Sequence, residues 1–370
     1  MDATPKPCIT ASADPLPPSL AEQGKFAVPA APLQRNDIRA LLTGPRDELY
    51  ARADAVRRTH VGDAVYLRGI VEFSNVCQND CLYCGIRKSN PNPRRYAIGD
   101  DEILDVARQM QRWGQTTIVL QSGEVDAELQ NERIARLIER IKRETTLAVT
   151  MSAGNRAQSV YARWRDAGMD RYLLRFETSN PEIFARLHPD CTLSDRVACL
   201  ESLRSLGLQV GSGFMIGVPG ETIETLVDNI VMVRDLDLDM VGVGPFVAHP
   251  DTPLAGERNA YADDPEICFA AVATLRIVDP DLRIPATTAF DALFPNTGRD
   301  LALQRGADVF MPNATPSRYR KEYLLYPDKP CVDEGDGNCA GCATARIWSI
   351  GRFVGEGPGH SPKSMAKAAE

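Results

Sequence analysis

The sequence is poor in histidine and in long apolar runs, and each shortage excludes a class of protein. Only four histidines occur in 370 residues, so a histidine-rich zinc hydrolase or a histidine-driven acid–base enzyme is not expected. No apolar run approaches the roughly 18 residues of a membrane span. The first 20 residues lack the basic-then-apolar order of a secretory signal. We therefore expect a cytoplasmic protein without a membrane partner.

Basic residues are also in deficit. The chain carries 42 basic and 50 acidic residues, a net charge of -8 and a pI near 5.3. This balance offers no broad basic surface for a phosphate backbone, so nucleic acid is not an expected partner. With 44% hydrophobic and 25% charged residues, the composition is that of an ordinary globular protein.

Cysteine, in contrast, is plentiful, with ten residues. Thiols in the cytosol are kept reduced, so metal ligands or core residues are more expected than disulfides. Six of the ten fall into two tight clusters. The remaining four are scattered and best explained as inert, buried thiols: Cys8, Cys191, Cys199 and Cys268.

The chain alternates strand-length apolar runs with amphipathic helical patterns. Eight such runs, rich in β-branched residues, occupy residues 64–73, 116–121, 147–152, 171–177, 209–217, 240–247, 283–290 and 308–313. Strands that alternate with helices predict a parallel sheet, and a count of eight predicts an α/β fold closed into a (β/α)8 TIM barrel. An open, doubly wound sheet is the alternative, because pattern alone does not prove closure.

Four segments are expected along the chain. Residues 1–35 are rich in Pro, Ala and Ser and predict a mobile extension. Residues 36–63 read as helical, with a break at Gly44-Pro45. The barrel is expected over 64–320, followed by a cysteine-containing C-terminal segment over 321–370.

The first cysteine cluster follows the first predicted strand. Cys77, Cys81 and Cys84 form C-x3-C-x2-C and are expected at the barrel mouth, where the strands end. A structural zinc site needs four protein ligands, and this loop offers no fourth Cys or His. A 4Fe-4S cluster held by three thiolates leaves one iron open to a small molecule. Zinc or incidental thiols remain the simpler alternatives.

This motif, with an aromatic residue at Tyr83, resembles the signature of radical S-adenosylmethionine (SAM) enzymes. The resemblance implies that SAM chelates the open iron and that one electron from the cluster breaks the sulfonium bond, releasing a 5′-deoxyadenosyl radical. Ser122, Gly123 and Glu124 resemble the superfamily's Gly-Gly-Glu motif, with serine at the first glycine. A glycine-containing segment over 213–222 resembles the element that approaches adenine, although a turn before a helix explains it equally well.

The fourth predicted strand ends in a pair of charged residues. Arg175 and Glu177 are two residues apart, so both are expected to face the barrel cavity while Phe176 points away. Charges are seldom buried without a partner or ligand. An Arg–Glu pair that only fills the barrel is the alternative.

The second cluster, Cys331, Cys339 and Cys342, forms C-x7-C-x2-C in a Gly- and Asp-rich loop after the predicted barrel. Three thiolates again suggest an iron–sulfur cluster, 4Fe-4S or 2Fe-2S. Zinc completed by another ligand is the alternative.

Several segments together, among them "LRGIVEFSNVCQNDCLYCGIRKSN", "DMVGVGPFVAHPDTPLA" and "MPNATPSRYRKEYLLYPDKPC", resemble the HydE family of iron-iron hydrogenase maturases across about residues 46–355. The resemblance implies work on an iron–cysteine–carbonyl–cyanide synthon in assembly of the hydrogenase H-cluster. It implies the partner maturases HydG and HydF, and reduced ferredoxin or flavodoxin as electron donor.

The resemblance also assigns residues to the site. Cys77, Cys81, Cys84, Arg175 and Glu177 are implied as catalytic. The cofactor-binding set is Tyr83, Ser122, Gly123, Glu124, Glu177, Arg196, Met311, Tyr323, Leu325 and Tyr326. Arg175, Thr178, Thr287 and Thr288 are implied to line the substrate space.

Departures from the family pattern leave the substrate open. Phe176 stands at the family's histidine, Val125 at an aspartate and Asn155 at a carboxylate; Asp291 could supply a different acid. A related enzyme resembling methylornithine synthase or biotin synthase, with a thiazolidine-type or other small substrate, is the alternative within the superfamily. A non-catalytic iron–sulfur scaffold is the alternative outside it, although SAM-pocket residues would be of no use to a scaffold.

Overall fold

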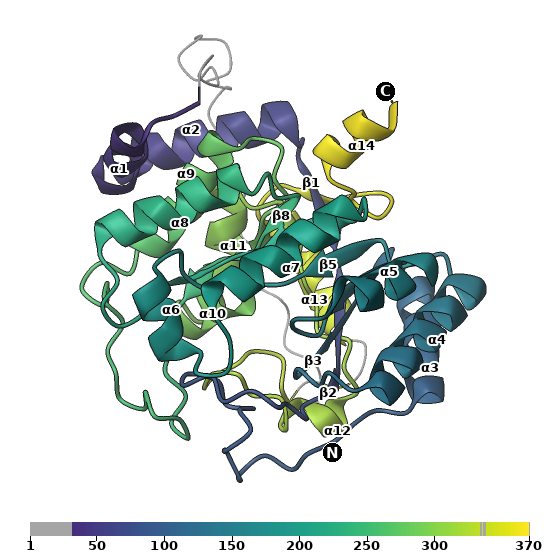
Figure 1. Ribbon diagram of the computed structural model, residues 1–370. Coiled ribbons are helices and arrows are strands. Elements are labelled where there is room, and N and C mark those ends of the chain that lie inside the picture. The colour runs from purple at the N-terminus through teal and green to yellow at the C-terminus, as the bar shows by residue number, and fades with distance from the viewer. Residues whose placement is uncertain (1–31, 334, 336–337, 370) are drawn as a thin grey trace, which may run out of the picture.

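The computed structural model describes residues 32–333, 335 and 338–369. The predicted extension over 1–35 lies almost wholly outside the described residues, and Cys8 lies outside them as well. Helices α1 (Arg35–Thr43) and α2 (Arg46–His60) flank the break expected at Gly44-Pro45. Both helices lie against the outside of the barrel, where α1 packs on α8 and α9, and α2 packs on α9 (Figure 1).

Eight parallel strands form a closed barrel, which confirms the predicted fold. One sheet has the order β2-β3-β4-β5-β6-β8, and a second has the order β10-β11-β1-β12. The barrel strands are β1 (Ala64–Leu67) with β2 (Gly69–Ser74), β3 (Thr117–Ser122), β4 (Ala148–Ser152), β5 (Arg171–Leu173), β6 (Gln209–Ser212), β8 (Met240–Val241), β10 (Pro285–Ala286) and β11 (Val309–Phe310). The short pair β7 (Met215–Ile216) and β9 (Gly244–Pro245) extends strands five and six.

Two junctions close the ring. β1 and β2 are one strand interrupted at Arg68, so β1 pairs with β11 on one side while β2 pairs with β3 on the other. At the second junction a parallel bridge joins Met240 to Arg283, and the amide of Val241 donates to the Arg283 carbonyl at 3.0 Å. The parallel strands therefore share one interior, and their carboxyl ends meet at one mouth.

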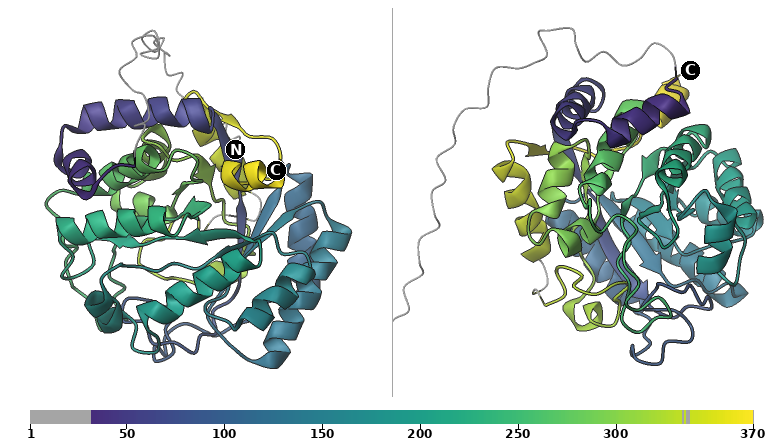
Figure 2. Two further views of the ribbon diagram at one scale, coloured as in Figure 1. Left: turned by 45° about the horizontal axis from the view of Figure 1, so that its top comes forward. Right: turned by 90° about the vertical axis from the view of Figure 1, so that its left-hand side faces the viewer.

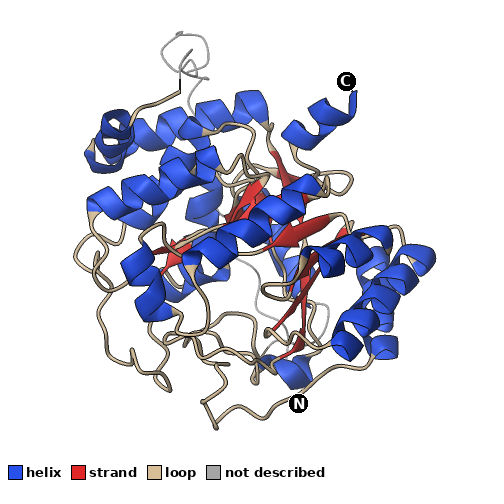
Figure 3. Cartoon of the chain, in the orientation of Figure 1, coloured by secondary structure: helices blue, strands red, loops and turns tan. Residues whose placement is uncertain are grey.

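Helices surround the strands (Figure 3). In chain order they are α3 (Asp100–Arg112), α4 (Glu128–Glu144), α5 (Gln158–Asp166), α6 (Pro181–Leu187), α7 (Leu193–Ser205), α8 (Ile223–Asp235), α9 (Ile267–Val278), α10 (Thr288–Leu293) and α11 (Gly298–Gln304). In α4 the apolar residues Ile134, Leu137, Ile138 and Ile141 recur at helical spacing and are all buried. One apolar stripe of this kind is what fixes a helix against a sheet.

The strand predicted over 283–290 is too long. Its strand part is confined to Pro285 and Ala286, and α10 begins at Thr288. A short apolar run cannot distinguish a strand from a buried helix by periodicity alone. The early turn is what leaves Thr287 and Thr288 at the mouth of the barrel.

The chain after the barrel strands comprises α12 (Ser317–Arg320), α13 (Asn338–Ser349), β12 (Phe353–Val354), which pairs with β1, and α14 (Pro362–Ala369). Its last part, from β12 onward, closes the other end of the barrel. Between β12 and α14 the backbone carbonyls of Pro358, Gly359 and His360 accept hydrogen bonds from Arg171, Arg68 and Arg283 at 2.7–3.0 Å. α14 accordingly lies beside α2, opposite the loops that follow β2 (Figure 2).

No helix among the described residues is long and apolar enough to cross a membrane.

Candidate active site

A cavity of about 350 Å³ opens at the carboxyl ends of the strands, within the size range of small-molecule sites. It gathers residues that are far apart in the sequence. Of the residues expected at the site, its wall contains Cys77, Cys81, Tyr83, Cys84, Ser122, Gly123, Glu124, Arg175, Glu177, Arg196, Thr287, Thr288, Met311, Tyr323, Leu325, Tyr326 and Cys331. Thr178 is fully buried and lies outside this wall, as do Cys339 and Cys342.

The loop that carries the first three cysteines is held by one arginine. The Arg95 guanidinium donates to four backbone carbonyls at 2.6–2.9 Å, those of Asn75, Ile86, Arg87 and Asn90. Within the loop the Cys84 amide donates to the Cys81 carbonyl at 3.3 Å. These bonds fix an irregular backbone, so the three thiols are presented to the cavity by a loop that is neither helix nor strand.

The environment of the thiols fits an iron cluster. Burial raises the pKa of Cys77 and Cys81 and raises the pKa of Cys84 to about 12, so these groups need a metal to become thiolates. No three Cys, His, Asp or Glu side chains in the described ranges converge as ligands of a single metal ion. A cluster instead places each thiolate on a different iron. The donor set is therefore compatible with a 4Fe-4S cluster held by three thiolates.

The end of β3 packs directly against this loop. A Cβ at Gly123 would overlap the backbone of Val76 and approach the side chain of Cys77, so only glycine allows the two segments to meet. The neighbouring Glu124 is largely buried, and burial raises the pKa of its carboxyl while Arg196 opposes this shift. Glycine is again required at residue 154, because a Cβ there would overlap the Glu124 carboxylate and φ is +86°.

Arg175 and Glu177 face the cavity as expected. Arg175 Nη2 lies 2.9 Å from Glu177 Oε2, and Arg175 Nε has no hydrogen-bond partner within the described part of the chain. Glu177 adopts a left-handed backbone conformation with φ of 63°, which is uncommon outside glycine and often marks a functional site. Phe176 is fully buried and packs on Phe214 with ring centroids 5.7 Å apart, which confirms that it points away.

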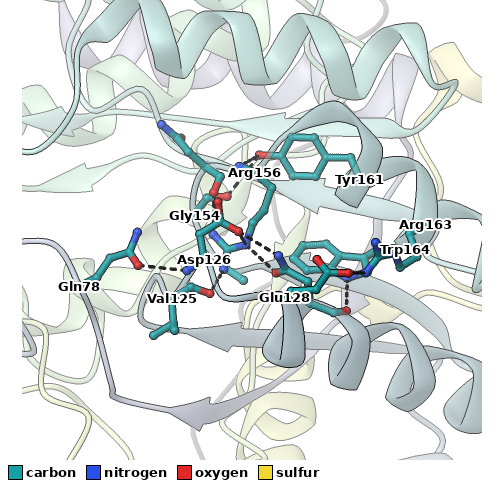
Figure 4. A network of polar contacts seen from close by, with 12 residues as sticks. Gln78, Val125, Asp126, Glu128, Gly154, Arg156, Tyr161, Arg163 and Trp164 are labelled. Atoms are coloured by element: carbon teal, nitrogen blue, oxygen red, sulfur yellow. Dashed lines mark hydrogen bonds and ion pairs between the residues drawn. The ribbon is translucent and has the colours of Figure 1, made fainter.

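The departures at Val125 and Asn155 lie outside the cavity wall. Arg156 instead holds both residues through their backbone carbonyls, at 2.7 Å and 2.6 Å (Figure 4). Its Nε also donates to the Asn131 side chain at 3.1 Å. Because Arg156 contacts only backbone atoms at 125 and 155, it tolerates a change of side chain at either position.

Asp291 does not supply an acid to the cavity, which corrects that expectation. It is buried outside the wall and accepts hydrogen bonds from Arg299 at 2.5 Å and from Arg346 at 2.8 Å. These two guanidinium groups hold the pKa of the Asp291 carboxyl below its usual range despite its burial. The residue thus joins α10, α11 and α13.

The second cysteine cluster is not confined to a loop, contrary to the sequence prediction. Cys339 and Cys342 lie in the first turns of α13, while Cys331 lies in the preceding segment with φ of 63°. Cys339 is buried and Cys342 is exposed. A hydrogen bond with Cys331, together with burial, raises the pKa of Cys339, so these two sulfurs are neighbours. The Asn313 amide donates to Cys339 Sγ at 3.2 Å.

Sequence reasoning missed four titratable residues of the wall, namely Glu72, His188, Arg299 and Lys329. His188 contacts the Tyr83 hydroxyl through Nε2 at 2.9 Å, and burial lowers its pKa to about 3. Of these residues, only Glu72 could have been predicted from the sequence, because a single acidic residue inside the apolar run "GIVEF" is unusual.

Comparison with known proteins accords with this geometry. The family model described as the radical SAM superfamily matches residues 71–233. The HydE subunit of the FeFe-hydrogenase maturase of Thermotoga maritima is 46% identical over 312 residues, which cover 84% of this chain and 88% of the relative. The chain belongs to the HydE family of radical SAM enzymes.

Other relatives lie further from this HydE family chain. A biotin synthase from Anaeromyxobacter sp. (strain K) is 31% identical over 287 residues, 75% of each chain. The crystal structure of methylornithine synthase (PylB) superposes with a TM-score of 0.76 at 24% identity, covering 92% of this chain and 97% of that one. The latter similarity shows a shared fold.

Proposed function

We propose that this HydE family protein uses a 5′-deoxyadenosyl radical to convert an iron–cysteine–carbonyl–cyanide synthon into a precursor of the FeFe-hydrogenase H-cluster. The single observation that carries the proposal is one cavity whose wall contains three cluster-type cysteines, the counterparts of the SAM contacts and an Arg–Glu pair. The similarity to the Thermotoga maritima hydrogenase maturase subunit supports a role in hydrogenase maturation.

In this proposal Cys77, Cys81 and Cys84 hold a 4Fe-4S cluster. The cluster and SAM, when bound, supply an electron and a carbon radical inside the cavity. The protein would hold SAM at the end of β3, where Gly123 lets the strand end pack against the cysteine loop and Glu124 offers a carboxylate to an amino group. Tyr83 and Arg196 complete this side of the wall, together with Met311, Tyr323 and Leu325.

The substrate side is formed by Arg175 and by the threonines after β10. Thr287 donates its hydroxyl to the Val243 carbonyl at 2.8 Å, and the hydroxyls of Thr288 and Tyr326 contact each other. A guanidinium and hydroxyl donors suit cyanide or carboxylate groups of a small anionic complex. Thr178, which the resemblance also implied here, would act only through its buried neighbours.

The accessory cysteines and the partners belong to the same proposal. Cys331 and the buried Cys339 would hold a second cluster, 4Fe-4S or 2Fe-2S, with the exposed Cys342 as third ligand. HydG would supply the synthon, HydF would receive the product, and reduced ferredoxin or flavodoxin would supply the electron.

Anaerobic reconstitution tests the first half of the proposal. Protein loaded with iron and sulfide, then given dithionite and SAM, is expected to form 5′-deoxyadenosine. Protein with a fully loaded cluster that forms no 5′-deoxyadenosine would favour a scaffold.

A maturation assay tests the second half. Addition of the loaded protein to a mixture that contains HydG, HydF and apo-hydrogenase is expected to restore hydrogenase activity. SAM cleavage without this recovery would favour another substrate.

A further inference from the structure

The cavity wall contains a buried ion pair to which no role has been given above. Lys329 Nζ contacts Glu72 Oε1, and the two side chains are only 6% and 3% exposed. Glu72 lies on β2, and Lys329 lies two residues before Cys331. The pair therefore joins the barrel strand that leads to the first cysteine loop with the segment that leads to the second.

A structural tether alone would not require charges here. Taking two ions out of water is costly, and well-packed apolar residues in place of a buried pair are often as stable or more stable. The other charges of the wall have been assigned: Arg175 pairs with Glu177, Arg196 neighbours Glu124, and Arg299 pairs with Asp291. This leaves Lys329 and Glu72 as charged groups inside a ligand cavity with no assigned ligand.

One N–H group of the Lys329 ammonium group has no hydrogen-bond acceptor within the described part of the chain. A lysine ammonium has three N–H groups. Within the described part of the chain Nζ has two acceptors, the Glu72 carboxylate and, at 3.0 Å, the Tyr323 carbonyl. Glu72 is braced separately, because Thr315 Oγ1 lies 3.4 Å from its other carboxylate oxygen. The ammonium group also lies 5.1 Å from the centroid of the Tyr323 ring. Its third N–H has no hydrogen-bond acceptor in the described part of the chain and can donate to a ligand in the cavity that Lys329 lines.

The surroundings indicate what that ligand would be. Glu72 and Arg299 both lie near enough to Tyr326 to influence the pKa of its hydroxyl, which burial raises, and Tyr326 contacts Thr288. This side of the wall thus combines an ammonium group, a guanidinium group and hydroxyl donors. Such a set favours a carboxylate over an uncharged or cationic group.

We propose that Lys329, held by Glu72, is a substrate-positioning residue whose ammonium group binds the carboxylate of the substrate. The inference rests on the proposed function only in assuming a substrate derived from an amino acid. Glu72 fixes the position of the Lys329 ammonium group. By partly neutralising its charge, Glu72 also lowers the affinity for the carboxylate, so that product can leave.

A pair of probes isolates the carboxylate. S-methyl-L-cysteine and 2-(methylthio)ethylamine differ only by that group, and neither has a thiol that could attack a cluster. Binding of each is measured by calorimetry to reconstituted, SAM-loaded protein. The wild type is expected to prefer the carboxylate probe by about tenfold or more, as for a hydrogen bond between charged groups.

Variants distinguish a substrate-positioning role of Lys329 from a purely structural role of the ion pair. The positioning role predicts that Lys329→Gln and Glu72→Gln have different effects on the preference for the carboxylate probe, and the structural role predicts the same effect. Lys329→Gln should abolish the preference, whereas Glu72→Gln should keep or increase it, since a competing carboxylate is removed. The double variant, free of any unpaired charge, should bind both probes equally. Lys321→Gln, an exposed lysine of the same segment, is the matched control and should behave as wild type.

Three outcomes would overturn the inference: no preference in the wild type, a preference that survives in Lys329→Gln, or equal weakening of both probes in Lys329→Gln and Glu72→Gln. Formation of 5′-deoxyadenosine without any probe is measured in parallel. It should be unchanged in Lys321→Gln, and its absence in the wild type would instead contradict the proposed function.

Discussion

At the scale of single residues, the site depends on close approach between strand ends. Gly123 lets β3 touch the first cysteine loop, and Gly154 leaves room for the Glu124 carboxylate. Motif reasoning found the first glycine but gave no reason for the second, because the need for Gly154 arises from a side chain 30 positions away in the sequence. Contacts of this kind, like the partner of Glu72, appear only once the chain is folded.

Replacement of Gly154 tests this packing. Gly154→Ala is expected to weaken SAM binding by about tenfold, because the new methyl group displaces the Glu124 carboxylate. Gly114→Ala is the matched control, since Gly114 has a similar φ of +74° but open space around the position of a Cβ. Both variants should lose some thermal stability through backbone strain. Equal SAM affinity in the two, measured by equilibrium dialysis, would show that Glu124 has no such role.

Replacement of one cysteine tests the ligand assignment. Cys81→Ala should abolish 5′-deoxyadenosine formation, because a cluster with two protein ligands is not held in place. Cys268→Ala, which removes a buried thiol within α9, should keep it. Retained SAM cleavage in Cys81→Ala would refute the assignment of the first cluster.

At the scale of elements, periodicity predicted the barrel well. Each of the eight predicted runs contains a barrel strand, because strand-length apolar runs mark the segments that are buried in the barrel. The lengths of the strands were overestimated, as at β5 and β10. After β5 the regular ladder is interrupted and only an isolated bridge joins Glu177 to Phe214, and after β10 the chain turns into α10 at Thr288. The start of α13 was predicted as a loop, because Gly and Asp residues precede it and its two cysteines were assigned to a metal-binding loop.

The position of α13 beside the barrel predicts that the second cysteine cluster is not needed for SAM cleavage at the first. Cys339→Ala should lower the iron content per protein yet leave 5′-deoxyadenosine formation largely intact, because Cys339 lies outside the cavity wall. Iron analysis and product chromatography on the same preparation measure both quantities. Loss of SAM cleavage in this variant would show that the second cluster is required for radical formation.

At the scale of the whole molecule, the barrel is open at one end and closed by its own C-terminal segment at the other. Three buried arginines donate to the backbone carbonyls of Pro358, Gly359 and His360. One of them, Arg68, is only 1% exposed, so little solvent reaches this end, and its burial strongly lowers the pKa of the guanidinium group. Substrate and SAM are thus confined to the mouth with the cysteines.

Truncation measures the contribution of this closure. A chain that ends at Gly355 leaves three buried guanidinium groups without these acceptors, at about 1–3 kcal/mol each, so its thermal midpoint should fall by many degrees. A chain that ends at Ser361 keeps the three carbonyls and should lose less, mainly the ion pair between Lys363 and Asp279. Equal midpoints for the two truncations would contradict this account of the closed end.

Electron–nuclear double resonance of the reduced cluster tests the central claim most directly. Oxygen-free protein is mixed with SAM labelled with ¹⁵N at the amino group and ¹³C at the carboxylate. We predict couplings from both nuclei to the cluster, because three thiolates leave one iron for these two groups. A cluster that shows neither coupling, with a fourth side chain on that iron, would contradict the account.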